Sequence, residues 1–270
     1  MNIDIRKIND IALKAGDAIM EIYASDDFEI ALKQDNSPLT KADRKSNEII
    51  SGALKSLYPE IPVLSEEGKA IPYEERKHWE YFWLVDPLDG TKEFIKHNGE
   101  FTVNIALLHL KTPVAGVIYA PALSASPAEN NQTGRHGTLY FSTNSEGAHK
   151  IDFQNGKETE IHTSEGIENS ITVVQSRSHS SEEEENFLLK YNVKNRIAIG
   201  SSLKFCMIAE GKADLYYRHG PTYEWDTAAG QAVLTSAGGR ITDLSGNEFV
   251  YNKPSLLNSS FIAARNGIKF

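Results

Sequence analysis

The sequence predicts a mixed α+β protein in which amphipathic helices alternate with short apolar strands. Apolar side chains recur at helical spacing over residues 8–23, so an amphipathic helix is expected near the start of the chain. Residues 101–110 and 113–119 are apolar runs separated only by Lys111 and Thr112, which indicates a hairpin of antiparallel strands. No internal repeat accompanies these elements, so neither a solenoid nor a propeller is predicted.

Other elements of the first half bring acidic residues to the end of a regular segment. Thr40 and Asp43 are spaced as a capping pair at the start of a second helix. The dipole of that helix favours a carboxylate there, which would explain Asp43 without a role in catalysis. Residues 61–64 and 81–85 are short apolar strands, and each runs directly into carboxylates.

The second half of the chain mixes strands and helices. Strands are predicted over residues 138–142, 171–175, 196–199, 213–217 and 240–242. Helices are predicted over residues 182–190, 203–210 and 227–237.

A change of composition between the two halves predicts a boundary. Residues 122–137 are rich in Ala, Ser, Pro, Asn, Gln and Gly, which is typical of a loop or a domain junction. We therefore expect an N-terminal α+β domain over residues 1–125, with the antiparallel sheet, and a C-terminal α/β domain over residues 126–270.

The charge balance narrows the class of ligand. The chain has 28 Lys and Arg against 37 Asp and Glu, a net charge of −9, and a sequence pI near 5.4. General binding to a nucleic-acid polymer is therefore not expected. A small phosphate ester remains compatible with this charge if a divalent cation bridges carboxylate and phosphate.

Cysteine content and hydropathy bear on the compartment. Cys206 is the only cysteine, so the chain can form no intrachain disulfide and no cysteine-based zinc site. Neither a signal peptide nor a run of about eighteen apolar residues is apparent. We expect a cytoplasmic protein with no transmembrane segment, and any metal site should be rich in oxygen ligands.

One apolar strand ends in a turn that carries two carboxylates. Pro87 fixes one backbone angle and Gly90 permits conformations closed to other residues. Asp86, the Leu88 carbonyl and Asp89 can then converge on a hard cation such as Mg²⁺. The same composition is typical of an ordinary surface turn, and this segment alone favours neither reading.

Four acidic residues share the same setting at the end of an apolar segment or the start of a helix. They are Glu66, Asp86, Asp89 and Asp226. Two carboxylates ~4 Å apart repel by roughly 4 kcal/mol at an effective dielectric constant of 20, so a cluster of four requires protons or cations. Bound Mg²⁺ would remove that repulsion and could activate a water for attack on a phosphoryl group, with Thr91 orienting the water. Four unrelated surface acids are the alternative.

Several separated motifs carry a resemblance to a known family. They are Glu66-Glu67, residues 83–107 (WLVDPLDGTKEFIKHNGEFTVNIAL), residues 200–209 (GSSLKFCMIA) and residues 224–229 (EWDTAA). Together they resemble the lithium-sensitive, magnesium-dependent phosphatases of the inositol monophosphatase superfamily, over nearly the whole chain. The resemblance implies a layered αβαβα sandwich and the hydrolysis of a 3′(2′),5′-bisphosphate nucleotide, 3′-phosphoadenosine 5′-phosphate, to AMP and phosphate.

The resemblance also implies roles for individual residues. It makes the metal ligands, for two or three Mg²⁺ ions, Glu66, Asp86, the Leu88 carbonyl, Asp89 and Asp226. It makes the catalytic residues that activate the attacking water Asp43, Glu66 and Thr91. The residues implied to surround the reactive phosphate are Glu66, Leu88, Asp89, Gly90, Thr91 and Asp226. Of the adjacent pair of glutamates, the family pattern uses the first, so Glu67 is expected to play a supporting part.

Two further segments match those that line the nucleotide side in related enzymes. The implied contacts are Ser176, His179, Gly200, Ser201, Ser202 and Lys204. A Ser-Ser-Leu-Lys turn that opens a helix offers amides, hydroxyls and a cation to a second phosphate. Capping of the helix by either serine is an equally good explanation for each of them.

The expected partner is a small phosphorylated nucleotide, and the residues do not separate a monomer from a homodimer. One alternative is a phosphatase of the same superfamily with an inositol phosphate or fructose 1,6-bisphosphate as substrate. Another is a sensor that binds metal or nucleotide without hydrolysis. Asp43, Glu66 and Thr91 argue against the sensor, because all the parts needed for hydrolysis are present.

Overall fold

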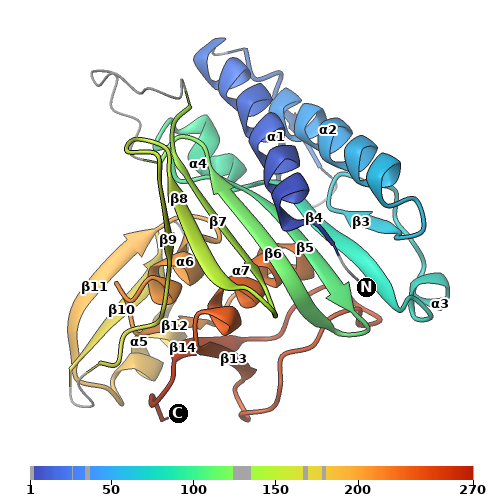
Figure 1. The fold of residues 1–270 in the computed structure, drawn as a ribbon. Coiled ribbons are helices and arrows are strands. Elements are labelled where there is room, and N and C mark those ends of the chain that lie inside the picture. The colour runs from blue at the N-terminus through green and yellow to red at the C-terminus, as the bar shows by residue number, and fades with distance from the viewer. Residues whose placement is uncertain are drawn as a thin grey trace.

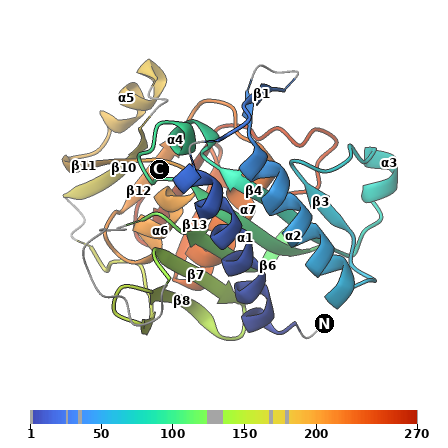
Figure 2. The ribbon, with the colours of Figure 1, turned by 90° about the horizontal axis from the view of Figure 1, so that it is seen from above.

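The described residues form five stacked layers (Figure 1). The computed structural model describes residues 3–25, 27–33, 37–123, 135–166, 170–177 and 181–269. Helices α1 (Ile5–Ser25) and α2 (Lys41–Leu57) lie side by side on the outer face of a first sheet (Figure 2). Helices α6 (Leu203–Ala209) and α7 (Glu224–Ser236) lie between this sheet and a second one, and α5 (Glu182–Leu188) packs on the far side of the second sheet. The predicted αβαβα sandwich is confirmed.

Seven strands of the described chain build the first sheet, and their order in the sheet follows their order in the sequence. They are β3 (Val63–Ser65), β4 (Tyr81–Asp89), β5 (Thr102–His109), β6 (Thr112–Ala120), β7 (Thr138–Thr143), β8 (Gly147–Asp152) and β9 (Lys157–Glu160). The pair β3–β4 is parallel and the later pairs are antiparallel. The predicted hairpin is confirmed as β5 and β6, whereas β8 and β9 are absent from the prediction.

The first sheet has a hydrophobic core on each face. Along β4, Phe82 and Leu84 pack toward α6 and α7, whereas Trp83 and Val85 pack toward α1 and α2. All four side chains are buried, as expected for a strand covered on both faces, which therefore reads as one continuous apolar run.

The second sheet has five strands within the described residues, in the order β11-β10-β12-β14-β13. Their bounds are β10 (Ile171–Ser176), β11 (Val193–Ile199), β12 (Leu215–Arg218), β13 (Gly239–Asp243) and β14 (Phe261–Arg265). The last strand, β14, lies between β12 and β13 and is antiparallel to both. The sequence prediction omits β14 and starts α7 three residues late, at Thr227 instead of Glu224.

Four short elements complete the described structure, with α3 before the start of β4 and α4 after its end. They are β1 (Ala31–Leu32), β2 (Pro38–Leu39), α3 (Tyr73–Arg76) and α4 (Thr91–Ile95).

Helix α7 approaches both of its neighbours closely because small residues form the contacts. A Cβ atom added to Gly116 on β6 would lie 2.7 Å from the Cβ of Ala232. One added to Gly230 would lie 2.3 Å from the ring of Phe205 on α6. The small-residue character of α7 therefore lets it fit between the two sheets.

The predicted boundary at residues 125–126 lies outside the described residues. Strands β7, β8 and β9 follow that point in the sequence and extend the first sheet through the pairing of β6 with β7. The first sheet thus contains residues from both predicted parts, and the division into domains 1–125 and 126–270 stays a prediction.

The described helices include none with the length and apolar character needed to cross a bilayer.

Candidate active site

Residues from distant parts of the chain line one pocket of about 340 Å³ at the end of β4 and the start of α7. The predicted site residues that line it are Glu66, Asp86, Leu88, Asp89, Gly90, Thr91, Ser176, Gly200, Ser201, Lys204 and Asp226. Asp43 and Ser202 are buried and do not line the pocket. The predicted contact His179 lies outside the described residues.

The end of β4 is a bulged strand, whereas the sequence predicted a turn directly after Val85. Asp86 pairs with Asn104 and Asp89 with Thr102, so β4 has one residue more than β5 over this stretch. Pro87 falls within the bulge, where a ladder amide is not needed. The bulge redirects the strand so that both carboxylates line the pocket.

Local hydrogen bonds fix the shape of this segment. The amide of Leu88 donates to Oδ1 of Asp86 over 3.0 Å, and the hydroxyl of Ser46 donates to the Pro87 carbonyl over 2.7 Å. Gly90 has a φ of 90°, in the left-handed region that favours glycine, and α4 starts at the next residue, Thr91. The conformational role predicted for Gly90 is confirmed.

The clustered carboxylates raise one another's pKa. Burial raises the pKa of Asp86 well above its usual value, and repulsion from Glu66, Asp89 and Asp226 adds to the increase. Burial and the same neighbours raise the pKa of Asp226 in the same way. Burial raises the pKa of Asp89 to about 6, although the Lys204 ammonium opposes the change. The ionised forms of these groups repel one another, so the donor set fits a hard divalent cation.

The carboxylates are nevertheless engaged with protein groups. Glu66 accepts a hydrogen bond of 2.6 Å from Lys33, which also bonds Glu67. Asp226 accepts a bond of 2.8 Å from the amide of Tyr223. Among the described residues, no three acidic, histidine or cysteine side chains already form a metal-binding group. A bound cation would therefore draw these side chains from their present partners.

Lys33 is a pocket residue that the sequence did not predict. Burial lowers the pKa of its ammonium, but Glu66 and Glu67 outweigh that effect and hold the pKa above its usual value. The lysine remains charged and partly neutralises the acidic end of the pocket. Residue 33 follows the short strand β1 in a polar stretch with no periodicity, so no sequence signal places it here.

Asp43 combines the capping function with a contact at the edge of the pocket. Its Oδ2 accepts bonds from the amide and the hydroxyl of Thr40, at 2.7 and 2.5 Å, so the capping explanation is confirmed. Its Oδ1 lies 3.2 Å from the hydroxyl of Thr91 and accepts a hydrogen bond from it. Burial raises the pKa of Asp43. The two oxygens thus serve α2 and the pocket separately.

The pocket also has a cationic part. Lys204 and Arg218 both line it, and each is buried. Burial lowers the pKa of Lys204 to about 8, although Asp89 opposes the decrease. The hydroxyl of Ser201 is buried without a hydrogen-bond partner in the described structure, and Ser201 has a left-handed φ of 48°. These groups suit a second anionic group of a ligand.

The adjacent Ser202 is placed differently. Its hydroxyl donates to Oδ1 of Asn104 over 2.7 Å and lies 2.8 Å from the hydroxyl of Thr102. Its side chain makes no cap bond to α6, so the capping explanation does not hold for Ser202. Its amide hydrogen bond lowers the pKa of Asp89, against the larger effect of burial. Ser202 therefore contacts Asp89 without lining the pocket itself.

Arg218 follows a predicted strand, which made it a weaker candidate for the nucleotide side than Ser201 or Lys204. It lines the pocket from the end of β12.

Comparison with known proteins places the chain in a family. The model of the inositol monophosphatase family matches residues 4–268. The chain is 43% identical to the 3′(2′),5′-bisphosphate nucleotidase CysQ of Salmonella typhimurium, over 95% of this chain and 98% of that protein. It is 34% identical to the CysQ of Haemophilus influenzae, over 93% of this chain and 89% of that protein.

Solved structures of related proteins are also similar to this chain. The crystal structure of CysQ from Bacteroides thetaiotaomicron aligns with a TM-score of 0.79 and 42% identity, over 96% of each chain. The extragenic suppressor protein suhB of Bartonella henselae, at 24% identity and a TM-score of 0.77 over 97% of this chain and 93% of that one, shares the fold. With its αβαβα layers and an acidic pocket at the end of the bulged strand β4, the chain belongs to the inositol monophosphatase family.

Proposed function

We propose that this protein is a 3′(2′),5′-bisphosphate nucleotidase that requires Mg²⁺ and hydrolyses 3′-phosphoadenosine 5′-phosphate to AMP and phosphate. A bond forms between the oxygen of a water and the phosphorus of the 3′-phosphate, and the bond from that phosphorus to the ribose oxygen breaks. The ribose oxygen takes a proton and becomes the 3′-hydroxyl of AMP. The identity of 43% over 95% of the chain with the Salmonella nucleotidase carries this proposal.

The acidic end of the pocket is proposed to hold the metal. Glu66, Asp86, the Leu88 carbonyl, Asp89 and Asp226 are the proposed ligands of two or three Mg²⁺ ions. Bound Mg²⁺ would neutralise the phosphate and lower the pKa of a coordinated water. The mutual repulsion that raises the pKa of the buried carboxylates supports this assignment.

Thr91 and Asp43 are proposed to orient the attacking water. The Thr91 hydroxyl donates its single hydrogen bond to Oδ1 of Asp43, which leaves its oxygen lone pairs free to accept a hydrogen bond from water. Because Asp43 bonds α2 through its other oxygen, the hydroxyl of Thr91 is held in one orientation. Glu66 lines the pocket nearby and can receive the proton that the water releases.

The cationic side is proposed to bind the nucleotide and its second phosphate. Lys204 and Arg218 supply charge, and Ser201 supplies a hydroxyl whose bonding capacity is not used within the described protein. Ser176 and Gly200 line the pocket beside them, and His179 follows in the sequence. The carboxylates are thus proposed to serve the reactive phosphate, through Mg²⁺, and the cations the second phosphate of the same substrate.

The test is the release of phosphate by the purified protein with Mg²⁺ and with each of three substrates. We expect 3′-phosphoadenosine 5′-phosphate to have a higher kcat/KM than inositol 1-phosphate or fructose 1,6-bisphosphate. A preference for either of the latter would reassign the substrate within the family. Tight binding of the nucleotide without release of phosphate would indicate a sensor.

The proposed ligands are tested by Asp89→Asn, which keeps the size of the side chain and removes its charge. We expect kcat to fall by about 10² or more while the far-ultraviolet circular dichroism is unchanged, because metal and phosphate lose a charged contact. Asp10→Asn, on the exposed face of α1, is the control. Near-normal turnover of Asp89→Asn would remove Asp89 from the site.

A further inference from the structure

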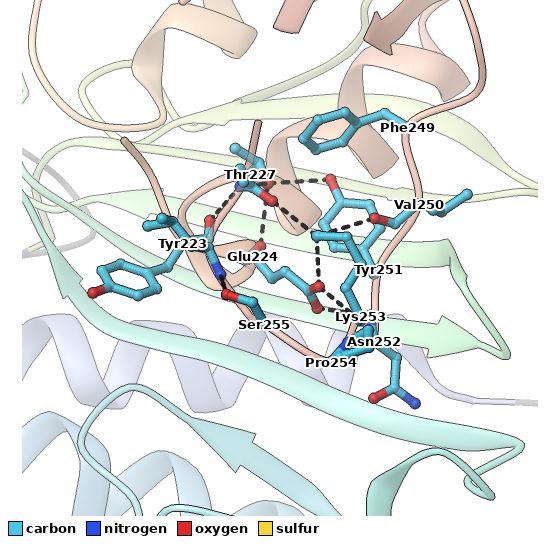
Figure 3. Close-up of polar contacts among 12 residues, drawn as sticks. Tyr223, Glu224, Thr227, Phe249, Val250, Tyr251, Asn252, Lys253, Pro254 and Ser255 are labelled. Atoms are coloured by element: carbon cyan, nitrogen blue, oxygen red, sulfur yellow. Dashed lines mark hydrogen bonds and ion pairs between the residues drawn. The ribbon is translucent and has the colours of Figure 1, made fainter. Parts of the chain in front are cut away.

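Glu224, the first residue of α7, is fully buried but does not line the pocket. Its carboxylate bonds the segment that leads from β13 to β14 (Figure 3). Oε2 accepts the amide of Asn252 at 2.7 Å, and Oε1 accepts the amide and the ammonium of Lys253 at 3.0 and 2.6 Å. Three donors therefore surround one carboxylate. We call residues 250–258 the brace loop.

The brace loop also holds the other side of the first turn of α7. The side-chain amide of Asn258 donates to the Tyr223 carbonyl over 2.7 Å and lies 3.2 Å from the hydroxyls of Thr222 and Thr227. The ammonium of Lys253 donates to Oδ1 of Asn258 over 3.1 Å, which joins the two sets of bonds. Residues 222–227 are thus fastened to the brace loop before and after Asp226.

The part of the brace loop that bonds Glu224 is also fixed to α3. Arg76 donates to Oδ1 of Asn252 over 2.7 Å and to the Pro254 carbonyl over 2.9 Å. The side-chain amide of Asn252 donates back to the Arg76 carbonyl over 2.7 Å. Asn252 has a left-handed φ of 54°, so this arrangement is held against a backbone cost of order 1 kcal/mol.

The energetics argue that this arrangement does more than stabilise the fold. Burial of an ion pair such as Glu224 and Lys253 contributes little net stability, because desolvation offsets the attraction between the charges. An exposed carboxylate in the first turn would interact with the helix dipole equally well, without being buried. Satisfied buried polar groups do, however, restrict a segment to one arrangement. The segment restricted here carries Asp226 at the third position of α7.

We propose that Glu224 is a positioning residue which, through the brace loop, fixes the first turn of α7 so that Asp226 faces the metal end of the pocket. This inference rests on the proposed function in one respect, namely that Asp226 binds Mg²⁺. Glu224 itself touches neither substrate nor metal.

Glu224→Gln tests the inference, because the glutamine amide places a donor against the donors of Asn252 and Lys253. The measurement is the dissociation constant of Mg²⁺ by titration calorimetry, without substrate, on protein whose fold is verified by circular dichroism. We expect Mg²⁺ to bind about 10-fold more weakly, at the lower end of the losses seen when groups that orient metal ligands are removed.

Glu210→Gln is the matched control. Glu210 is also a glutamate with a nearly buried side chain, and it accepts bonds from Lys150 at 2.9 Å and from Tyr140 at 3.2 Å, but it does not line the pocket. We expect its melting temperature to fall as that of Glu224→Gln does, with the Mg²⁺ affinity unchanged. Equal loss of stability in both variants with unchanged Mg²⁺ affinity in both would overturn the inference.

A double variant separates positioning from charge. Glu224→Gln removes a negative charge near the metal end, which would itself weaken the binding of a cation. Glu224→Gln combined with Lys253→Met restores the wild-type charge balance but not the bonds to the brace loop. If the double variant still binds Mg²⁺ more weakly than the wild type, the positioning role of Glu224 is supported. If it binds Mg²⁺ with wild-type affinity, the weaker binding of Glu224→Gln is due to the lost charge alone and the inference is wrong.

Two further variants serve as a substitute for Glu224→Gln and as a test of whether Asp226 binds Mg²⁺. If Glu224→Gln fails to fold, Asn258→Ala removes the side-chain bonds to Thr222, Tyr223 and Thr227 and keeps the backbone bonds and the ion pair. The same weakening of Mg²⁺ binding is expected. Asp226→Asn tests the premise separately. If Asp226→Asn binds Mg²⁺ as the wild type does, the ligand assignment in the proposed function is wrong, whatever the result at Glu224.

Discussion

At the scale of single residues, the adjacent Glu66 and Glu67 differ in environment although they share a lysine. Both carboxylates bond Lys33, but only Glu66 lines the pocket. Burial raises the pKa of Glu67 against the opposing effect of Lys33, as for a carboxyl group enclosed by protein. The resemblance alone selected Glu66 over Glu67 as a metal ligand, and that assignment stays a prediction.

Two matched substitutions test this difference. We expect Glu66→Gln to lower kcat by about 10²-fold or more, because it removes a proposed metal ligand and proton acceptor. We expect Glu67→Gln to change kcat by less than about 10-fold, because it loses only a bond to Lys33. Steady-state rates at saturating Mg²⁺ provide the comparison. Equal losses in the two variants would contradict the assignment.

The pKa of Lys204 predicts that kcat/KM depends on pH. Burial lowers the pKa of its ammonium to about 8, so in the free enzyme the positive charge is present below that pH and is lost above it. We expect kcat/KM for 3′-phosphoadenosine 5′-phosphate to fall as the pH rises from 7 to 9 at constant Mg²⁺. Adenosine 3′-phosphate, which lacks the second phosphate, is the control substrate and should show a smaller fall. Parallel profiles for the two substrates would place Lys204 away from the second phosphate.

At the scale of helices and strands, the same glycine-to-alanine change should have opposite effects in two helices. Gly230 in α7 faces the Phe205 ring, so Gly230→Ala is expected to destabilise the fold by about 1–3 kcal/mol through overpacking. Gly52 in α2 is exposed and a Cβ there would have no neighbour within 4 Å. Gly52→Ala is expected to stabilise the protein by about 0.5–1 kcal/mol through helix propensity. Urea denaturation measures both, and stabilisation by Gly230→Ala would contradict the observed packing.

The sequence predicted the elements that have a strong pattern in neighbouring residues, and it missed strands that lack such a pattern. The capping pair at Thr40 and the hairpin of β5 and β6 are local features, so sequence spacing identified them. Strand β9 (Lys157–Glu160) is polar throughout and lies at the sheet edge, so no apolar alternation marks it. Strand β14 contains two alanines, which favour strands weakly, and it forms because β12 and β13 pair with it on both sides.

The sequence also predicted the part of the candidate site that has a local pattern and missed the part that depends on distant contacts. Asp86, Asp89 and Asp226 stand at ends of regular segments, so their positions could be compared along the sequence. Lys33 and Glu224 take their roles from contacts with residues more than twenty positions away, with Glu66 and with Lys253. Such contacts depend on how the chain packs, and they produce no local pattern of spacing in the sequence.

At the scale of the whole molecule, the pocket brings together like charges that the fold must hold apart. Burial and mutual repulsion raise the pKa of Asp86 and Asp226 in the folded protein, so these two groups lower the stability of the metal-free protein at neutral pH. The acidic pocket is thus a place where function and stability oppose each other.

We therefore expect Mg²⁺ to raise the melting temperature. A ligand that binds only the folded state adds about 2.7 kcal/mol at a concentration 100 times its dissociation constant. Thermal unfolding in Mg²⁺ and in EDTA, with NaCl matching the ionic strength, measures the effect. Asp86→Asn should be more stable than the wild type in EDTA and should gain less from Mg²⁺. Identical melting curves in Mg²⁺ and EDTA would contradict a metal site in this pocket.

The place of β14 has a consequence for synthesis of the chain in the cell. Residues 261–265 leave the ribosome after β12 and β13, yet they lie between these two strands and pair with both. Until that moment two strands present unpaired edges, and edges of this kind recruit other chains. The second sheet therefore closes only after residue 265 has left the ribosome, and nascent chains that stall before residue 261 should depend on chaperones to stay unaggregated.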